Sequence, residues 1–198
     1  MSTWALVPVK AHGAGKQRLA TALGDAERGL LVQVMLQQVL AALTGAGLTD
    51  VLVLSPVRPA LPAGIGHLSD AGDGLNAGLA RALTELARRE AEAALIVFAD
   101  LPLIEPADIQ ALLAQLGPGV TLAPDRDGSG TNALGLTLPT RFGLKFGPGS
   151  CARHLAEAAR VGLEAGIVRR AGLAFDIDEP ADLAALRARA DPRYAFLG

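Results

Sequence analysis

Short apolar runs alternate with stretches of helical periodicity along nearly the whole chain. Continuous apolar runs are typical of buried strands, and they occur at residues 3–9, 50–55, 94–100, 120–125 and 132–139. Apolar residues spaced by three and four positions predict helices at 25–47, 74–91, 106–116, 149–166 and 180–190. Because strands alternate with helices, we expect an α/β fold with a mostly parallel central sheet and helices on both faces.

Two segments near the carboxyl terminus have weaker patterns. Residues 173–178, LAFDID, read as the tip of a further strand, in which Asp176 and Asp178 would point to the same face. Two carboxylates side by side repel each other unless a cation lies between them or one stays protonated. The tail at 191–198 shows no clear period and is expected to be irregular.

Length and composition indicate one globular domain over residues 1–198. The formal net charge is -2 and no basic patch with interleaved aromatics occurs, so nucleic acid is not expected as a partner. No apolar stretch reaches the ~20 residues that a membrane helix needs, and no signal-peptide pattern occurs, so we expect no membrane association. The one cysteine, Cys151, cannot form an internal disulfide, which favours a cytoplasmic location.

Polar and glycine-rich loops follow the predicted strands. They read KAHGAGKQR, SDAGDGLN, ADLP, DRDGSGTN and DIDEP. Parallel sheets bind ligands beyond the carboxyl ends of their strands, so these loops predict one site at one edge of the sheet.

The first of these loops carries Lys10, Lys16 and Arg18 directly after the first strand. Backbone amides freed by glycine, together with three cations, suit a polyphosphate. The loop is not a P-loop, because Lys10 and Gln17 stand where that motif requires Gly and Ser or Thr. A solvated basic turn is the alternative interpretation.

Two later loops offer groups for a second, smaller anion. In DGSGTN, glycines let Thr131 and Asn132 grip an anion or a base edge, although a plain hairpin turn is equally compatible. Ser150 lies at or just before a helix start, where free amides bind phosphate or carboxylate. His154 would share its helix face, either as a ligand contact or as a partly buried structural histidine. Serine hydrolase chemistry is not favoured, since no G-x-S-x-G elbow occurs.

Three aspartates at predicted strand ends form a candidate metal site. Asp100 ends the central strand, and Asp176 and Asp178 end the last one. Magnesium binds one or two carboxylates together with phosphate oxygens, so these residues predict Mg²⁺ carried with a nucleotide. The alternative is that Asp178 caps the following helix and Asp176 is solvated.

Six motifs follow one another along the chain: VPVKAHGAGKQRLA, GDGLNAGLARAL, FADLPLI, DGSGTNALGL, FGPGSCARH and FDIDEPADL. From about residue 4 to 186, the chain resembles the 2-phospho-L-lactate guanylyltransferase family of coenzyme F-420 biosynthesis. The resemblance implies a single-domain fold of the nucleotide-diphospho-sugar transferase (GT-A-like) type. It also implies transfer of GMP from GTP to the phosphate of a small phosphorylated acid, with release of pyrophosphate. Phosphoenolpyruvate is the favoured acid, and 2-phospho-L-lactate and 3-phospho-D-glycerate are the alternatives.

The resemblance also implies roles for particular residues. The triphosphate would be held by Lys10, Lys16 and Arg18, which act in catalysis with Asp100, and the guanosine would lie near Gly74 and Asn76. The acid would be held by Thr131, Gly147 and Ser150, beside Asn132 and His154. The magnesium ligands would be Asp100, Asp176 and Asp178. The chain departs from the family pattern at Gln17, where a serine is more usual.

This chemistry needs no protein nucleophile, because the phosphate oxygen of the acid is already anionic. Positioning and charge stabilisation by Mg²⁺, lysine and arginine are sufficient. The alternatives are a glycosyltransferase with DID as its metal motif, a molybdopterin-type guanylyltransferase, and a nucleotide-binding module without turnover. We expect a monomer or a homodimer.

Overall fold

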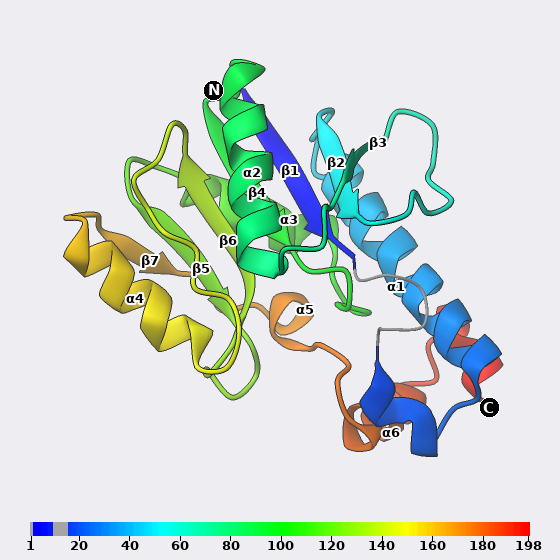
Figure 1. The fold of residues 1–198 in the computed structure, drawn as a ribbon. Coiled ribbons are helices and arrows are strands. Elements are labelled where there is room, and N and C mark those ends of the chain that lie inside the picture. Colours follow the sequence, from blue (N-terminus) through cyan, green and yellow to red (C-terminus); the bar gives the residue numbers. More distant parts are fainter. Residues whose placement is uncertain (1, 10–15) are drawn as a thin grey trace.

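A seven-stranded sheet runs through the centre of the molecule (Figure 1). The computed structural model describes residues 2–9 and 16–198, so Lys10 of the predicted phosphate loop lies outside the described residues. The strands are β1 (Thr3–Pro8), β2 (Val51–Ser55), β3 (Gly66–Ser69), β4 (Ala93–Val97), β5 (Val120–Pro124), β6 (Thr131–Thr137) and β7 (Ala165–Ile167). Their order is β3-β2-β1-β4-β6-β5-β7. Neighbours are parallel except where β6 pairs with β4 and β5, which confirms the predicted mostly parallel sheet.

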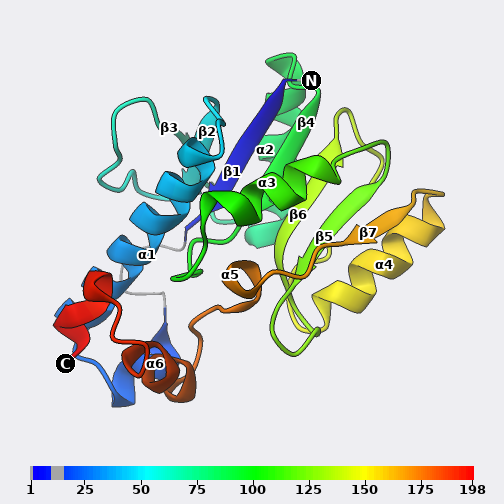
Figure 2. The ribbon, with the colours of Figure 1, turned by 180° about the vertical axis from the view of Figure 1, so that it is seen from behind.

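Helices cover both faces of this sheet (Figures 1 and 2). The helices are α1 (Asp25–Gly45), α2 (Leu75–Arg88), α3 (Pro106–Ala114), α4 (Ser150–Arg160), α5 (Ala171–Ala174) and α6 (Pro180–Arg187). One face carries α1 and α3, and the other carries α2 and α4. None of the helices in the described part of the chain is long and apolar enough to cross a membrane.

Successive strand residues enter the two apolar layers in turn. In β1, Ala5 and Val7 pack under α1, whereas Leu6 packs under α2. Side chains alternate across a strand, so a strand that is buried on both faces needs apolar residues throughout. This explains why the central strands read as continuous apolar runs in the sequence.

A third apolar cluster lies beside the sheet, where the segment after β1 meets the C-terminal segment. It joins the 3-10 helix η1 (Gln17–Thr21), the first half of α1, helix α6 and the 3-10 helix η2 (Pro192–Leu197). The prediction of an irregular tail is wrong, because η2 buries Tyr194 and Leu197 in this cluster. The Tyr194 hydroxyl also donates to the carbonyl of Pro102 at 3.2 Å.

The predicted strand at LAFDID is also wrong. Its first residues belong to α5, and the segment 175–178 that follows lies outside the sheet. Phe175 and Ile177 are buried in the third cluster, which produces the alternating pattern that reads as a strand. The backbone amide of Ile177 donates to the carbonyl of Asp100 at 3.2 Å, so the segment still passes the end of β4.

Candidate active site

A cavity of about 1270 Å³ opens at the carboxyl ends of the parallel strands. Residues from all five predicted loops line it. Because β6 is antiparallel to β4, it begins at the edge where β4 ends, which brings Thr131 to the same cavity. Pockets for one small molecule usually measure about 300–1,000 Å³, so this cavity has room for two ligands.

Most of the predicted site residues border this cavity. Those that do are Lys16, Arg18, Gly74, Asp100, Thr131, Asn132, Gly147, Ser150, Asp176 and Asp178. The side chains of Asn76 and His154 instead make hydrogen bonds to the protein that account for their polar groups, as described below. The roles of the lining residues in binding and catalysis remain predictions.

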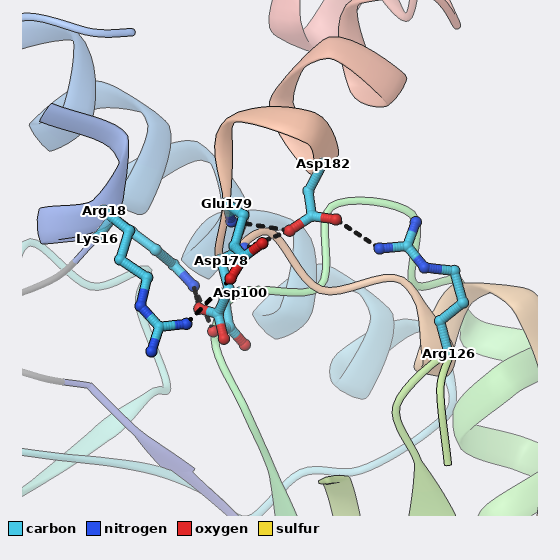
Figure 3. A network of polar contacts seen from close by, with 7 residues as sticks. All are labelled: Lys16, Arg18, Asp100, Arg126, Asp178, Glu179 and Asp182. Carbon is cyan, nitrogen blue, oxygen red and sulfur yellow. Dashed lines mark hydrogen bonds and ion pairs between the residues drawn. The ribbon is translucent and has the colours of Figure 1, made fainter. Parts of the chain in front are cut away.

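Lys16 lies between two of the predicted metal ligands (Figure 3). Its ammonium donates to Asp100 Oδ2 at 2.6 Å and to Asp178 Oδ1 at 2.8 Å, and only 9% of its side chain is exposed. Burial opposes the charged form, but the carboxylates of Asp100 and then Asp178 raise the pKa of Lys16 above its usual value. The lysine is therefore charged and acts as the counter-ion of this acidic pair.

Asp176 is the third carboxylate of this group, and its side chain is half-buried. Burial, then the charges of Asp100 and Asp178, raise the pKa of Asp176 to about 6, although hydrogen bonds from its own backbone and from Asn132 oppose the rise. The Asn132 amide also donates to the carbonyl of Leu173 at 3.0 Å, so it spans α5 and the acidic segment. A cation placed among the three carboxylates would lower the pKa of Asp176 again.

The predicted three-carboxylate cage is not preformed. Within residues 2–9 and 16–198, no group of three His, Cys, Asp or Glu side chains is disposed to hold a metal ion as it stands. The ammonium of Lys16 occupies the space between Asp100 and Asp178. The donor set still suits a hard cation, because all three groups are carboxylates and their charge exceeds that of the lysine.

Asp182 holds the acidic segment in place (Figure 3). Its Oδ2 accepts the backbone amides of Glu179 at 2.8 Å and Asp178 at 3.0 Å, which caps α6. Its Oδ1 accepts a hydrogen bond from Arg126, in the loop between β5 and β6. The alternative prediction that Asp178 caps this helix is therefore wrong: Asp182 supplies the cap, and the Asp178 carboxylate accepts from Lys16.

Two further loops that line the cavity, 125–130 and the turn before α4, are joined by a backbone hydrogen bond. Asp125 accepts the amides of Ser129 and Gly130 at 2.8 and 2.7 Å, and a Cβ on Gly130 would lie 2.5 Å from that carboxylate. The carbonyl of Ser129 in turn accepts the amide of Cys151 at 3.0 Å. Ser150 is the first residue of α4, borders the cavity and is 2% exposed.

Two predicted ligand contacts have other partners in the structure. The Asn76 amide binds the backbone of Phe146, donating to its carbonyl at 3.0 Å and accepting its amide at 2.8 Å. His154 is fully buried and lies at hydrogen-bond distance from Thr131 Oγ1 and the Lys145 amide, 3.0 Å in each case. Both side chains bind the backbone of the loop that precedes α4. Their polar groups are therefore satisfied by the protein and not by a ligand.

Asp70 and Arg28 are among the lining residues that were not predicted as site residues. Asp70, directly after β3, borders the cavity with its carboxylate 3.6 Å from Arg81. Its position after a strand is a signal that could have identified it. Arg28 borders the cavity from the first turns of α1 and donates to the carbonyl of Leu23 at 2.9 Å. Nothing in the sequence distinguishes Arg28 from an ordinary surface residue of a helix.

The buried histidine predicts a pH-dependent stability. Burial and the charges of Arg153 and Lys145 lower the pKa of His154 to about 4 from 6.5, against the opposing effect of Glu157. Between these values the unfolded chain binds a proton that the folded chain does not, so stability falls as pH drops from about 6.5 to 4. We expect roughly 3 kcal/mol of unfolding free energy to be lost over this range through His154.

Urea unfolding of the wild type and of His154→Gln between pH 7.5 and 4 measures this contribution. Other titrating groups affect both proteins alike, so the difference between the two curves isolates the histidine. Parallel curves would contradict the prediction.

This fold, a mostly parallel sheet with a cavity at the carboxyl ends of its strands, is shared with solved structures of nucleotide-diphospho-sugar transferases and nucleotidyltransferases. The structure resembles a Desulfovibrio desulfuricans G20 protein assigned to the nucleotide-diphospho-sugar transferases, with a TM-score of 0.80 at 19% identity. That match covers 99% of this chain and 94% of the other. It also resembles 2-C-methyl-D-erythritol 4-phosphate cytidylyltransferase from Thermus thermophilus, with a TM-score of 0.59 at 20% identity, over 96% and 99% of the two chains. These likenesses establish the fold.

Sequence comparison then gives the family. Residues 3–195 match the family described as guanylyl transferase CofC like. The chain is 44% identical over 200 residues to phosphoenolpyruvate guanylyltransferase of Rubrobacter xylanophilus, covering 98% of each chain. It is also 44% identical over 196 residues to the enzyme of that name from Sphaerobacter thermophilus, covering 96% of this chain and 95% of the other. The chain belongs to the CofC-like guanylyl transferase family.

Proposed function

We propose that this chain transfers the guanylyl group of GTP to the phosphate of phosphoenolpyruvate in coenzyme F-420 biosynthesis. An oxygen of the acceptor phosphate forms a bond to the α-phosphorus of GTP, and the bond from that phosphorus to the bridging oxygen of pyrophosphate breaks. One observation carries the proposal. Lys16 and three aspartates line one cavity together with Thr131 and Ser150.

The part of the cavity around Lys16 and the three aspartates, the nucleotide wall, suits the nucleotide. Lys16 is charged and largely buried, so it can stabilise negative charge on the phosphates better than an exposed cation. Arg18 is mostly exposed, and its ion pair with Glu179 is long at 3.3 Å, so it can turn to a triphosphate at low cost. Asp100, Asp176 and Asp178 would hold Mg²⁺. When bound, that ion would neutralise phosphate charge during transfer.

The loop between β3 and α2 suits the base. Gly72, Gly74 and Leu75 border the cavity there, next to the Asp70 carboxylate. Guanine offers two adjacent donors, its N1–H and its 2-amino group, to a carboxylate, whereas adenine offers no such pair. We therefore expect Asp70, and not Asn76, to select the base.

Turnover assays with each nucleotide and acid test the function directly. Pyrophosphate release is measured with GTP or ATP, in combination with phosphoenolpyruvate, 2-phospho-L-lactate or 3-phospho-D-glycerate. We expect GTP with phosphoenolpyruvate to be the best pair and ATP to be at least about 100-fold poorer, because a site that hydrogen-bonds one base leaves groups unpaired with another. Equal rates with ATP and GTP would exclude guanine selection, and no release with any pair would exclude the function.

Ser150→Ala tests the acceptor wall, by which we mean the part of the cavity lined by Thr131 and Ser150, where the acid is proposed to bind. The Ser150 side chain is almost fully buried yet borders the cavity, so its loss removes a hydrogen bond to the acid and leaves the nucleotide wall intact. We expect the KM for phosphoenolpyruvate to rise about 10-fold and the KM for GTP to stay unchanged. Ser55→Ala is the matched control, because Ser55 is also 2% exposed, its hydroxyl donates to the carbonyl of Val57 at 2.9 Å, and it does not border the cavity. A variant that weakens GTP and spares the acid would show that the two subsites are exchanged.

A cytoplasmic location is part of the same proposal. Cys151 is a buried free thiol, and a chain whose one cysteine is unpaired suits a reducing compartment. Mild oxidation should leave activity unchanged, because the thiol is shielded from solvent.

A further inference from the structure

His154 lies behind the acceptor wall and not in it. It sits on α4 with no exposed surface, and its ring lies 5.7 Å from that of Phe142 and 4.8 Å from that of Phe146, between centroids. It does not border the cavity. Any effect of this histidine on a ligand must therefore pass through the groups that it binds.

The two hydrogen bonds of the ring define its tautomer. The backbone amide of Lys145 can only donate, so Nε2 of His154 accepts that bond, at 3.0 Å. A neutral imidazole has one donor and one acceptor nitrogen, which puts the proton on Nδ1. Burial and two nearby cations lower the pKa of His154 to about 4, so the ring is neutral at physiological pH. Nδ1 therefore donates to Thr131 Oγ1, 3.0 Å away.

This hydrogen bond determines whether the Thr131 hydroxyl can donate to a ligand or only accept from one. Its oxygen accepts from the histidine, so its own hydrogen must point elsewhere. In the described part of the chain, the bond to His154 is the only one that Thr131 Oγ1 makes. Thr131 is 5% exposed and borders the cavity, so its hydrogen is available to an oxygen of a ligand there. With the opposite tautomer, the hydroxyl would donate to the ring and present lone pairs to the anion.

The second hydrogen bond of the ring, from the Lys145 amide, holds the segment that leads to Ser150. Lys145 lies in the segment that leads through Gly147 to Ser150. Asn76 binds the next residue, Phe146, through both its amide and its carbonyl. The histidine thus connects Thr131 on β6 with the loop that carries Ser150.

We propose that His154 is a positioning residue of the acceptor subsite: it directs the Thr131 hydroxyl to donate to the phosphorylated acid and fixes the loop that faces it. The inference rests on the proposed function, because it takes that acid to be the ligand of this wall.

The test is a double-mutant cycle read as separate KM values for phosphoenolpyruvate and GTP. His154→Gln can keep an acceptor for the Lys145 amide but lacks the ring donor at Nδ1, and Thr131→Val removes the hydroxyl. We expect each single change to raise the KM for the acid about 10-fold and to leave the KM for GTP within about 2-fold. The double variant should be no worse than Thr131→Val alone, since the histidine acts through that hydroxyl.

Thr121→Val is the matched control. Thr121 is 2% exposed and its hydroxyl donates to the carbonyl of Gln115 at 2.9 Å, away from the cavity. It should lower stability without moving either KM.

The outcomes separate this inference from the proposed function. A wild type that releases no pyrophosphate overturns the function and the inference together. An active wild type overturns the inference alone in three cases: His154→Gln leaves the acid KM unchanged, it raises both KM values equally, or its effect adds fully to that of Thr131→Val. If His154→Gln does not fold, Thr131→Val is the deciding variant. An unchanged KM for the acid in that variant would show that the Thr131 hydroxyl does not bind the acid, which overturns the inference.

Discussion

Replacement of Asp178 by asparagine is expected to lower turnover by roughly 1,000-fold while the fold stays intact. The side chain is 57% exposed and faces Lys16 and the cavity, and its shape is kept by asparagine. The backbone of residue 178 is held by Asp182, independently of the Asp178 carboxylate. The change therefore removes one charge from the proposed metal site and leaves the segment in place.

Pyrophosphate release at limiting Mg²⁺ measures the effect, and urea unfolding checks the fold. Asp127→Asn is the matched control, since Asp127 is an exposed aspartate that does not border the cavity. We expect the control to keep full turnover. Full turnover of Asp178→Asn at limiting Mg²⁺ would remove Asp178 from the metal site.

The layered fold could be predicted because its signals are local. Each central strand is buried on both faces, and each long helix presents apolar residues to one layer, so both types are visible in a window of the sequence. The meeting of the loops at one edge also followed, because parallel strands share the direction of their carboxyl ends. These two rules were enough to bring Lys16, Asp100 and Thr131 to one cavity.

The two wrong structural predictions, at residues 173–178 and 191–198, have a common physical cause. Phe175 and Ile177 alternate with aspartates as in a strand, but they pack in one cluster with Leu19 and Leu183, outside the sheet. A two-residue period reports alternating burial and does not say whether the backbone is paired in a sheet. The same applies to η2, which is ordered by its contacts with α1 and α6 and has no period of its own.

Polar residues present a second limit. A histidine or asparagine in a ligand-binding loop reads the same whether its partner is a ligand or the backbone. Only the fold shows that Asn76 binds Phe146, 70 residues away, and that Asp182 binds Arg126, 56 residues away. Residues that support a site are thus harder to predict than residues that line it, because their partners are distant in sequence.

The final prediction concerns Lys16, whose ammonium lies between two of the aspartates proposed to hold the metal ion. Its ammonium lies within 2.8 Å of both Asp100 and Asp178. A metal ion that binds these aspartates must displace it, so the lysine and the metal compete until phosphates offer the lysine another partner. Lys16→Met removes the competitor and, with it, a charge that would stabilise the triphosphate.

We therefore expect Lys16→Met to lose turnover but to bind Mg²⁺ more tightly than the wild type. Turnover should fall by roughly 1,000-fold, because a buried cation next to the phosphates is lost. Without nucleotide, the variant should be less stable by about 1–3 kcal/mol, since unpaired carboxylates remain. Added Mg²⁺ should raise its melting temperature at concentrations about 10-fold lower than in the wild type, since binding to the folded state no longer has to displace an ammonium.

Arg18→Met is the control for this comparison, because Arg18 lies two residues from Lys16, in η1, but pairs with Glu179 at the surface and not with the aspartates. We expect it to leave the metal response unchanged. Thermal unfolding against Mg²⁺ concentration decides between two arrangements of the site. A Lys16→Met variant that binds Mg²⁺ as weakly as the wild type, or more weakly, would mean that the ion binds elsewhere and that the lysine is a permanent partner of the two aspartates. Tighter binding with lost turnover would mean that Lys16 exchanges its aspartates for phosphates when the substrate arrives.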